Sequence, residues 1–115
     1  MKQLETLTKL SKNIKIYVPS TVDVDKKIDT SKNVDETLTM LSNKFGGSTS
    51  TKGTGTWVTK DNKLVKEDVT ICESYCTGSD LSNSINDVIQ YCNELKSELN
   101  QEAISLEVNN ELYFI

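Results

Sequence analysis

The sequence predicts an α+β domain of the ferredoxin-like type, with two helices packed on one face of an antiparallel sheet. Two segments have apolar residues at helical spacing, and each lies between segments that alternate in polarity. The predicted order is strand, helix, strand, strand, helix, strand, with a short extra strand at the C-terminus. A chain of 115 residues fits one domain. We place this domain at residues 14–115 and interpret residues 1–13 as an arm or a short helix.

The first half of the domain begins with a short strand and continues into a helix. Residues 14–18 alternate in polarity as far as Pro19, which ends a predicted strand. The polar segment 20–32 is expected to form a long loop. Asn33 and Glu36 have the spacing of a capping box and predict the start of a helix. Its apolar row, followed by Gly46-Gly47 as the predicted helix end, consists of Val34, Leu38, Leu41 and Phe45.

The second half is predicted to contain a strand pair, a long helix and a terminal hairpin. After a loop at 48–53, strands are expected at 54–59 and 64–75, joined by a turn at Asp61-Asn62. Gly78-Ser79-Asp80 opens the second helix, whose apolar row is Leu81, Ile85, Val88, Cys92, Leu95 and Leu99. Strands at 103–108 and 112–115 follow, connected by Asn109-Asn110, a pair of residues that hairpin turns favour.

The charge pattern disfavours binding to nucleic acid. The net charge is −4, all thirteen basic residues are lysines, and the sequence contains neither arginine nor histidine. An acidic domain without arginine lacks the planar group that grips phosphate or guanine with two hydrogen bonds. Without histidine, an enzyme of this sequence would use carboxylates, lysine, tyrosine or cysteine.

The three cysteines, Cys72, Cys76 and Cys92, do not predict a disulfide framework or a metal site. An odd number of cysteines argues against structural disulfides, and the C-x-x-C spacing of zinc sites is absent. We therefore interpret the thiols as small core side chains and expect no cofactor and no metal. Because no apolar run is long enough to span a bilayer and residues 1–13 do not have the pattern of a secretory signal, we expect a cytoplasmic protein without membrane contact.

Several short motifs resemble those of an uncharacterised family of small bacterial α+β proteins, a domain of unknown function. They are Gly53-Thr54-Gly55-Thr56-Trp57, Val65-Lys66-Glu67, Gln101-Glu102-Ala103 and Tyr113-Phe114. From Ile16 to Ile115 the chain is most similar to small proteins that plasmids, phages and integrated elements of low-GC Gram-positive bacteria carry. The resemblance implies a compact ferredoxin-like fold and no particular activity. The family often has an arginine in the glycine-containing motif, which this chain lacks.

The glycine-rich segment 46–57 is the first candidate for a binding site. It combines glycines and hydroxyl side chains with Lys52 and Trp57, so its backbone N–H groups could face an anion. It is not a P-loop, because the lysine precedes its glycine and no helix follows. The alternative is a helix end that continues as a flexible crossover. The binding candidates within this segment are Lys52, Gly53, Thr54, Gly55 and Trp57.

Two carboxylates and the tryptophan complete the list of candidates. Glu67, between Val65 and Val69, is expected on an inward strand face, where a carboxylate must be paired or hydrogen-bonded. It would otherwise lie at an edge. Glu102 either caps backbone amides or reaches a pocket beside Glu67. Trp57 is a core residue or a platform for stacking.

The function that these features favour is a non-catalytic accessory protein of a mobile element. It would bind a small, nucleotide-like ligand near the glycine-rich segment. One alternative is a protein-interaction module that inhibits a host defence or regulatory protein. Another is an enzyme that uses carboxylates or Cys72.

The sheet face away from the helices predicts a homodimer. Its expected side chains are too apolar for contact with water, namely Tyr17, Val58, Leu64, Cys72, Tyr113 and Ile115. A second copy would cover this face and give a two-fold symmetric interface. The rival cover is the arm at 1–13, with Leu4, Leu7 and Leu10.

Overall fold

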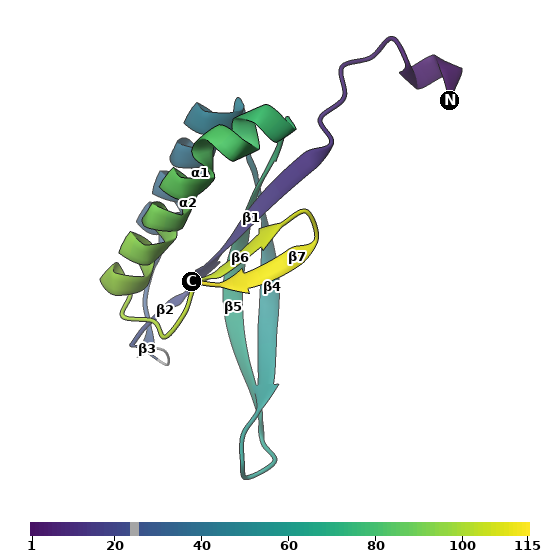
Figure 1. Cartoon of the computed structure of the whole chain (residues 1–115). Coiled ribbons are helices and arrows are strands. Elements are labelled where there is room, and N and C mark those ends of the chain that lie inside the picture. Colours follow the sequence, from purple (N-terminus) through teal and green to yellow (C-terminus); the bar gives the residue numbers. More distant parts are fainter. Residues whose placement is uncertain (24–25) are drawn as a thin grey trace.

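The computed structural model, which describes residues 1–23 and 26–115, confirms an α+β fold with two helices on one face of an antiparallel sheet (Figure 1). The strand order is β4-β5-β1-β6-β7. The first four of these strands have the order of a ferredoxin-like sheet, and β7 is added at one edge. The elements are β1 (Lys12–Pro19), α1 (Ser31–Phe45), β4 (Thr49–Val58), β5 (Leu64–Cys76), α2 (Gly78–Glu98), β6 (Ser105–Val108) and β7 (Glu111–Phe114).

The core lies between the helices and one face of the sheet. Ile14, Ile16 and Val18 of β1 are buried because alternate residues of a strand point to the same side. The apolar rows predicted for both helices pack against them. Their fully buried members are Leu41, Phe45, Val88, Cys92, Leu95 and Leu99. The expected end of α1 is also confirmed, because Gly46 adopts a φ of 89° that favours glycine.

The start of α1 differs from the prediction of a capping box at Asn33. The helix begins at Ser31 with Thr30 as its N-cap, and Asn33 is buried inside it. Asp29 satisfies part of the helix start, since its Oδ1 accepts a hydrogen bond from the Ser31 N–H at 2.9 Å. The sequence pattern was misleading because Asp29 can serve an earlier start equally well.

The predicted loop at 20–32 contains regular structure. Strands β2 (Thr21–Val22) and β3 (Lys26–Lys27) form a small antiparallel pair. The last residues of the segment belong to α1. The residues Val24 and Asp25 of this expected loop lie outside the described part of the chain.

Most of the predicted loop at 48–53 belongs to a strand, which continues into the strand expected at 54–59. Strand β4 begins at Thr49 and pairs with β5 along its whole length, from Thr49 opposite Glu73 to Val58 opposite Leu64. Local composition disfavours this strand, but β4 lies at the sheet edge, where the partner strand supplies the hydrogen bonds. The β4–β5 hairpin continues beyond the two helices (Figure 1).

The C-terminal hairpin follows the prediction, with a shorter first strand. Asn109 and Asn110 have φ angles of 50° and 69°, the left-handed values of a tight two-residue turn. Strand β6 begins at Ser105 rather than at residue 103.

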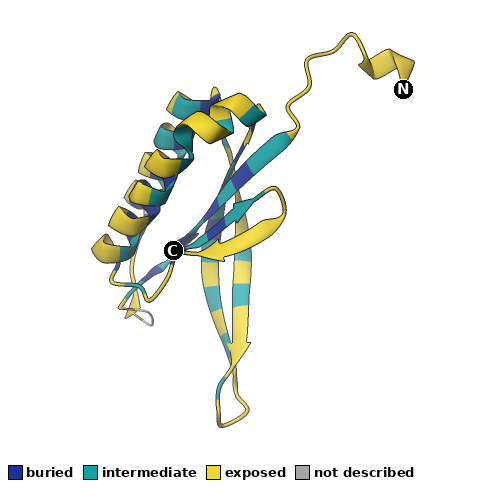
Figure 2. Ribbon diagram, viewed as in Figure 1, coloured by how far each residue is buried: buried dark blue, intermediate teal, exposed yellow. Residues whose placement is uncertain are grey.

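The N-terminal segment does not lie on the sheet. Residues 1–11 are exposed and lead away from the domain, with a short 3-10 helix at Lys2–Leu4 (Figures 1 and 2). The arm therefore does not act as the lid that its three leucines suggested. Among the described residues, no helix is long and apolar enough to cross a membrane.

Candidate functional site

A cluster of charged and polar side chains occupies the sheet face that the helices leave open. Successive residues of β1 point to opposite faces of the sheet. Ile14 and Ile16 point to the buried face, so Asn13, Lys15 and Tyr17 point to the open face. Lys15 pairs across the strands with Glu73 of β5 on one side and with Glu107 of β6 on the other. The sheet thus holds an ammonium group between two carboxylates.

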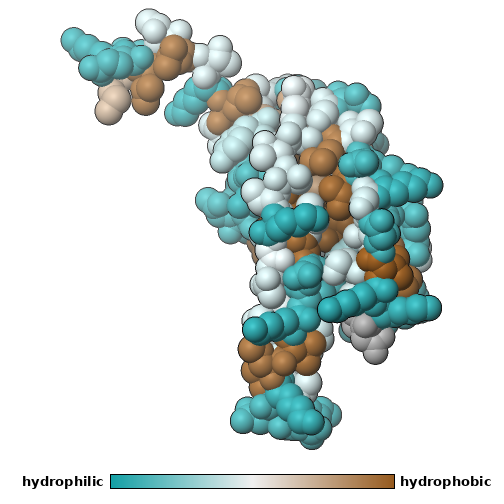
Figure 3. All heavy atoms as spheres, turned by 180° about the vertical axis from the view of Figure 1, so that it is seen from behind, coloured by the Kyte–Doolittle hydropathy of each residue, from teal (hydrophilic) through white to brown (hydrophobic). Residues whose placement is uncertain are grey.

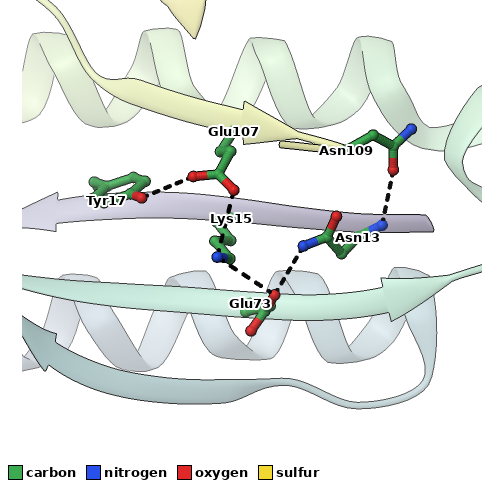
Figure 4. A network of polar contacts seen from close by, with 6 residues as sticks. All are labelled: Asn13, Lys15, Tyr17, Glu73, Glu107 and Asn109. Atoms are coloured by element: carbon green, nitrogen blue, oxygen red, sulfur yellow. Dashed lines mark hydrogen bonds and ion pairs between the residues drawn. The ribbon is translucent and has the colours of Figure 1, made fainter. Parts of the chain in front are cut away.

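The contacts of this open-face cluster, drawn in Figure 4, join three strands. The Lys15 Nζ lies 3.4 Å from Oε2 of Glu107 and 3.9 Å from Oε2 of Glu73. The Tyr17 hydroxyl donates to Oε1 of Glu107 at 2.9 Å, and the Asn13 amide donates to Oε2 of Glu73 at 3.0 Å. All three charged side chains are half-buried, with 27% of Lys15, 24% of Glu73 and 16% of Glu107 exposed. One positive and two negative charges leave a net charge of −1.

The electrostatics keep Lys15 charged and Tyr17 protonated. Desolvation by burial works against the Lys15 ammonium, but the Glu107 and Glu73 carboxylates outweigh it and raise the pKa of Lys15. Burial and the hydrogen bond to Glu107 raise the pKa of Tyr17. At neutral pH the cluster therefore offers carboxylates to a cation and N–H or O–H donors to an anion.

The apolar side chains of the open face are largely not those that the sequence predicted, since β5 places Val65, Val69 and Ile71 there. Cys72 was expected on this face but is fully buried on the helix side. Val58, Leu64 and Tyr113 also lie on the helix side. Leu64 lies on the same side of β5 as the buried Cys72, and Val58 is its cross-strand partner. Tyr113 is the cross-strand partner of the buried Leu106. The apolar residues that share the face of Glu107 at this edge are Leu112 and Phe114, both exposed.

Three of the seven predicted binding residues line a cleft on the helix side. The cleft has a volume of about 540 Å³ and lies between the start of α1 and the β4–β5 hairpin. Lys52, Gly53 and Thr54 form part of its wall. The Lys52 ammonium donates to the Thr70 hydroxyl at 2.9 Å, which holds the lysine against the sheet.

The other four predicted residues are not part of this cleft. Glu67 was expected on an inward face, but it shares a side of β5 with Glu73, opposite the buried positions. Its Oε1 accepts a hydrogen bond from the Thr21 hydroxyl at 2.7 Å. Gly55 pairs with Glu67, and Trp57 lies farther along the hairpin with 45% of its surface exposed. Glu102 is exposed in the turn that precedes β6.

The cysteines are unsuited to nucleophilic catalysis. All three are buried and free. Burial raises the pKa of Cys72 to about 11 and that of Cys92 to about 12, so neither forms the reactive thiolate at neutral pH.

Sequence reasoning did not identify Lys15, Glu73 and Glu107. The signal was present in the first strand, where Lys15 and Tyr17 alternate with the apolar residues Ile14 and Ile16. The pairing of this strand with both glutamates depends on the register of strands that are distant in sequence, and no local pattern reveals that register.

Comparison with known proteins shows a similarity of fold to two solved structures. Neither a protein-family model nor a curated protein matches the sequence. Two solved structures of a phage SAM lyase are similar to the chain. The lyase in complex with S-methyl-5′-thioadenosine has a TM-score of 0.66 and 17% identity, covering 97% of this chain and 94% of that chain. The lyase in its apo state has a TM-score of 0.61 and 16% identity, covering 96% and 95%.

Proposed function

We propose that this protein binds an adenosyl sulfur compound at the open-face cluster and cleaves S-adenosylmethionine (SAM) there. The observation that carries the proposal is the arrangement of Lys15, Glu73 and Glu107 on a fold similar to that of a phage SAM lyase. The proposal takes up the carboxylate enzyme among the functions that the sequence left open. It extends the expectation of a nucleotide-like ligand, because the ligand of the similar structure is a nucleoside thioether.

The charges of the cluster match those of SAM. The substrate carries a sulfonium, an ammonium and a carboxylate, so its net charge of +1 complements the net charge of −1 on the cluster. Glu73 and Glu107 would face the sulfonium and the ammonium, and Lys15 and Asn13 would face the carboxylate. Opposite charges in a half-buried site attract more strongly than in bulk water.

The reaction needs little acid–base chemistry, which fits a chain without histidine. SAM and S-methyl-5′-thioadenosine differ by the aminocarboxypropyl arm, so the bond broken is the one from sulfur to that arm. The electron pair stays on sulfur, which leaves as a neutral thioether and needs no proton. The carboxylate oxygen of the same arm attacks the carbon that leaves sulfur, so a C–O bond replaces the C–S bond and the arm closes into a lactone without water. The carboxylates of the cluster would attract and orient the cationic substrate for this displacement.

The experiment is to incubate the protein with SAM and to separate the products by chromatography with mass detection. We expect S-methyl-5′-thioadenosine in multiple turnovers. Glu107→Gln should lose this activity, while Glu98→Gln, an exposed glutamate of α2 outside the cluster, should retain it. Wild-type protein that binds S-methyl-5′-thioadenosine but releases none from SAM would leave the non-catalytic ligand-binding function. Protein that neither binds S-methyl-5′-thioadenosine nor cleaves SAM would contradict both the lyase and the non-catalytic ligand-binding function.

We also propose that the protein belongs to a mobile element and acts as a homodimer whose copies meet at the β7 edge of the open face, beside the cluster. The similarity to a phage protein supports the first point. The exposed Leu112 and Phe114 beside the cluster support the second, as does the distance of the arm from this face. Light scattering at micromolar concentration should give a dimer mass, and deletion of residues 1–13 should leave this mass and the melting temperature nearly unchanged. A monomer mass would contradict the dimer.

The projecting hairpin supports the alternative of a host protein partner. Trp57, Val58 and Leu64 are exposed near the turn of this hairpin, and Figure 3 shows an apolar band next to the charged tip of the hairpin. A partner that docks here should be recovered by the wild type and lost with Trp57→Ala. Equal recovery with both proteins would contradict this docking site.

A further inference from the structure

The cleft on the helix side has features of a second binding site, separate from the open-face cluster. Its walls are the first turns of α1 and the inner face of the β4–β5 hairpin. The strand alternation of β5 directs Asp68 and Thr70 toward the cleft and Glu73 toward the opposite face. A ligand in the cleft would therefore not occupy the site that we propose for SAM.

The charged lining of the cleft is mainly acidic. Asp35 of α1 and Asp68 of β5 line opposite walls, and in the described part of the chain neither carboxylate has an ion-pair or hydrogen-bond partner. The third carboxylate, that of Asp29, is already stabilised. Hydrogen bonds from Ser31 and the nearby Lys52 charge lower its pKa. Two uncompensated negative charges thus face each other across the cleft.

An unpartnered hydroxyl adds an acceptor to this lining. Thr30 is only 7% exposed and lines the cleft. It is the N-cap of α1, but its side chain makes no capping hydrogen bond, nor any other hydrogen bond to a residue that the structure describes. The Thr30 Oγ1 is not enclosed by the described residues, so it is accessible from the cleft and can accept a hydrogen bond from a ligand there.

The surface between the polar groups is apolar. Ile28 and Val34 contribute apolar side chains to the lining. A ligand that fits this arrangement has a cationic donor at each end and hydrocarbon between them. A single metal ion fits less well, because among the described residues no three acidic or cysteine side chains are close enough to hold one.

We propose that the cleft binds a linear aliphatic diamine or polyamine. One ammonium group contacts Asp35 and Thr30 on the α1 wall, and the other contacts Asp68 on the β5 wall. The methylene chain lies on Ile28 and Val34. This site is independent of the proposed SAM cleavage.

The test is calorimetric titration of the full chain at constant ionic strength with ethylenediamine, putrescine, cadaverine, hexamethylenediamine and spermidine, with MgCl₂ as the reference. Two carboxylates at a fixed separation select a chain length, so we expect saturable binding with a maximum at one member of the diamine series. An affinity that rises only with ligand charge, or binding of Mg²⁺ equal to that of the best amine, would overturn the proposal.

Variants locate the site. Asp35→Asn and Asp68→Asn should each weaken binding of the best amine about threefold to fivefold, the usual effect of one exposed ion pair. Thr30→Val should weaken it about threefold through the lost hydrogen bond. The matched control is Asp61→Asn in the hairpin turn, which should bind as the wild type does. Equal losses for Asp61→Asn and the cleft variants would contradict the assignment. Glu107→Gln should reduce SAM cleavage about a hundredfold and leave amine binding unchanged, so each proposal can fail without the other.

Discussion

The two faces of the sheet use the same strands for different purposes. In β1, the helix-covered face carries Ile14 and Ile16, both fully buried, while the open face carries Lys15 and Tyr17 between two glutamates. The covered face buries apolar surface and provides most of the stability. The open face holds charges in place at half burial. The difference teaches that one strand can serve both stability and ligand binding, because alternate residues point to opposite faces of the sheet.

The reactivity of side chains differs in the same way. On the covered face, burial raises the pKa of Cys72 and Cys92 and keeps both thiols neutral. On the open face, the neighbouring carboxylates keep Lys15 in its charged form. The two thiols of the covered face are therefore silent, whereas the charged groups of the open-face cluster are available to a ligand.

The largest expected effect is on the covered face. Ile16→Ala should lower the free energy of unfolding by about 3 kcal/mol, because it removes buried methyl groups and leaves a cavity. Its neighbour on the other face provides the contrast, since Lys15→Met should change the free energy by less than about 1 kcal/mol. Urea denaturation followed by circular dichroism measures both. Similar losses for the two variants would contradict the division between the faces.

The next effect concerns activity. Glu107→Gln should reduce kcat/KM for SAM cleavage about a hundredfold, equivalent to about 2.7 kcal/mol of transition-state stabilisation, because it removes a negative charge beside the sulfonium. The unfolding free energy should change by less than about 1 kcal/mol. Steady-state kinetics and urea denaturation separate the two quantities. A variant with full activity would remove Glu107 from the proposed site.

The buried thiols predict a pH dependence of stability. Their folded pKa values are raised above the ordinary value of 9, to about 11 for Cys72 and about 12 for Cys92. Between pH 9 and the folded pKa, the native state binds more protons than the unfolded state, so stability falls as pH rises. The slope contributed by each thiol should approach, at most, about 1.4 kcal/mol per pH unit.

Urea denaturation from pH 8 to pH 10.5 measures this slope. Cys92→Val should flatten it, because valine has no proton to lose. An unchanged slope in this variant would show that other groups cause the pH dependence.

A smaller effect is expected at Tyr17. Tyr17→Phe removes the hydrogen bond to Glu107 and leaves the ring in place, so SAM cleavage should fall about fivefold, which corresponds to about 1 kcal/mol, the typical net value of one hydrogen bond. The fall should appear in kcat rather than in KM if Tyr17 orients Glu107 for the reaction. Loss of affinity for S-methyl-5′-thioadenosine without a change in kcat would assign Tyr17 to binding instead.

The smallest effect is expected at the hairpin. Trp57→Ala should change the unfolding free energy by less than about 0.5 kcal/mol, because nearly half of the side chain is exposed. Thermal denaturation at low protein concentration measures this change. A loss comparable to that of Ile16→Ala would indicate that the exposed band is buried in an assembly.

The parts of the fold that depend on local pattern could be predicted from the sequence. The helical rows ending at Phe45 and Leu99 and the turn at Asn109-Asn110 are local signals, and the structure confirms them. The first half of β4, at 49–53, was not predicted as strand, because its partner β5 determines its conformation rather than its own composition. The inward placement of Glu67 failed for a similar reason. Val65 and Val69 suggested an apolar face, but the helices cover the other side of β5.

The candidate site was predictable only in part. Lys52, Gly53 and Thr54 do line a concave region, as a glycine-rich segment with a lysine suggested. Their role as binding residues, like that of Gly55, Trp57, Glu67 and Glu102, stays a prediction. The open-face cluster depends on Lys15 lying opposite two glutamates that are distant in sequence, and this register forms only in the folded sheet.

The most direct test of the central claim, that the open face is the site of the adenosyl ligand, is an NMR titration of ¹⁵N-labelled protein with S-methyl-5′-thioadenosine. We predict that the amide shifts concentrate at 13–17, 71–75 and 105–108, around the open-face cluster, and that Glu107→Gln weakens them. Shifts confined to 28–35, 52–54 and 68–70 would place the ligand in the cleft on the helix side and contradict the account.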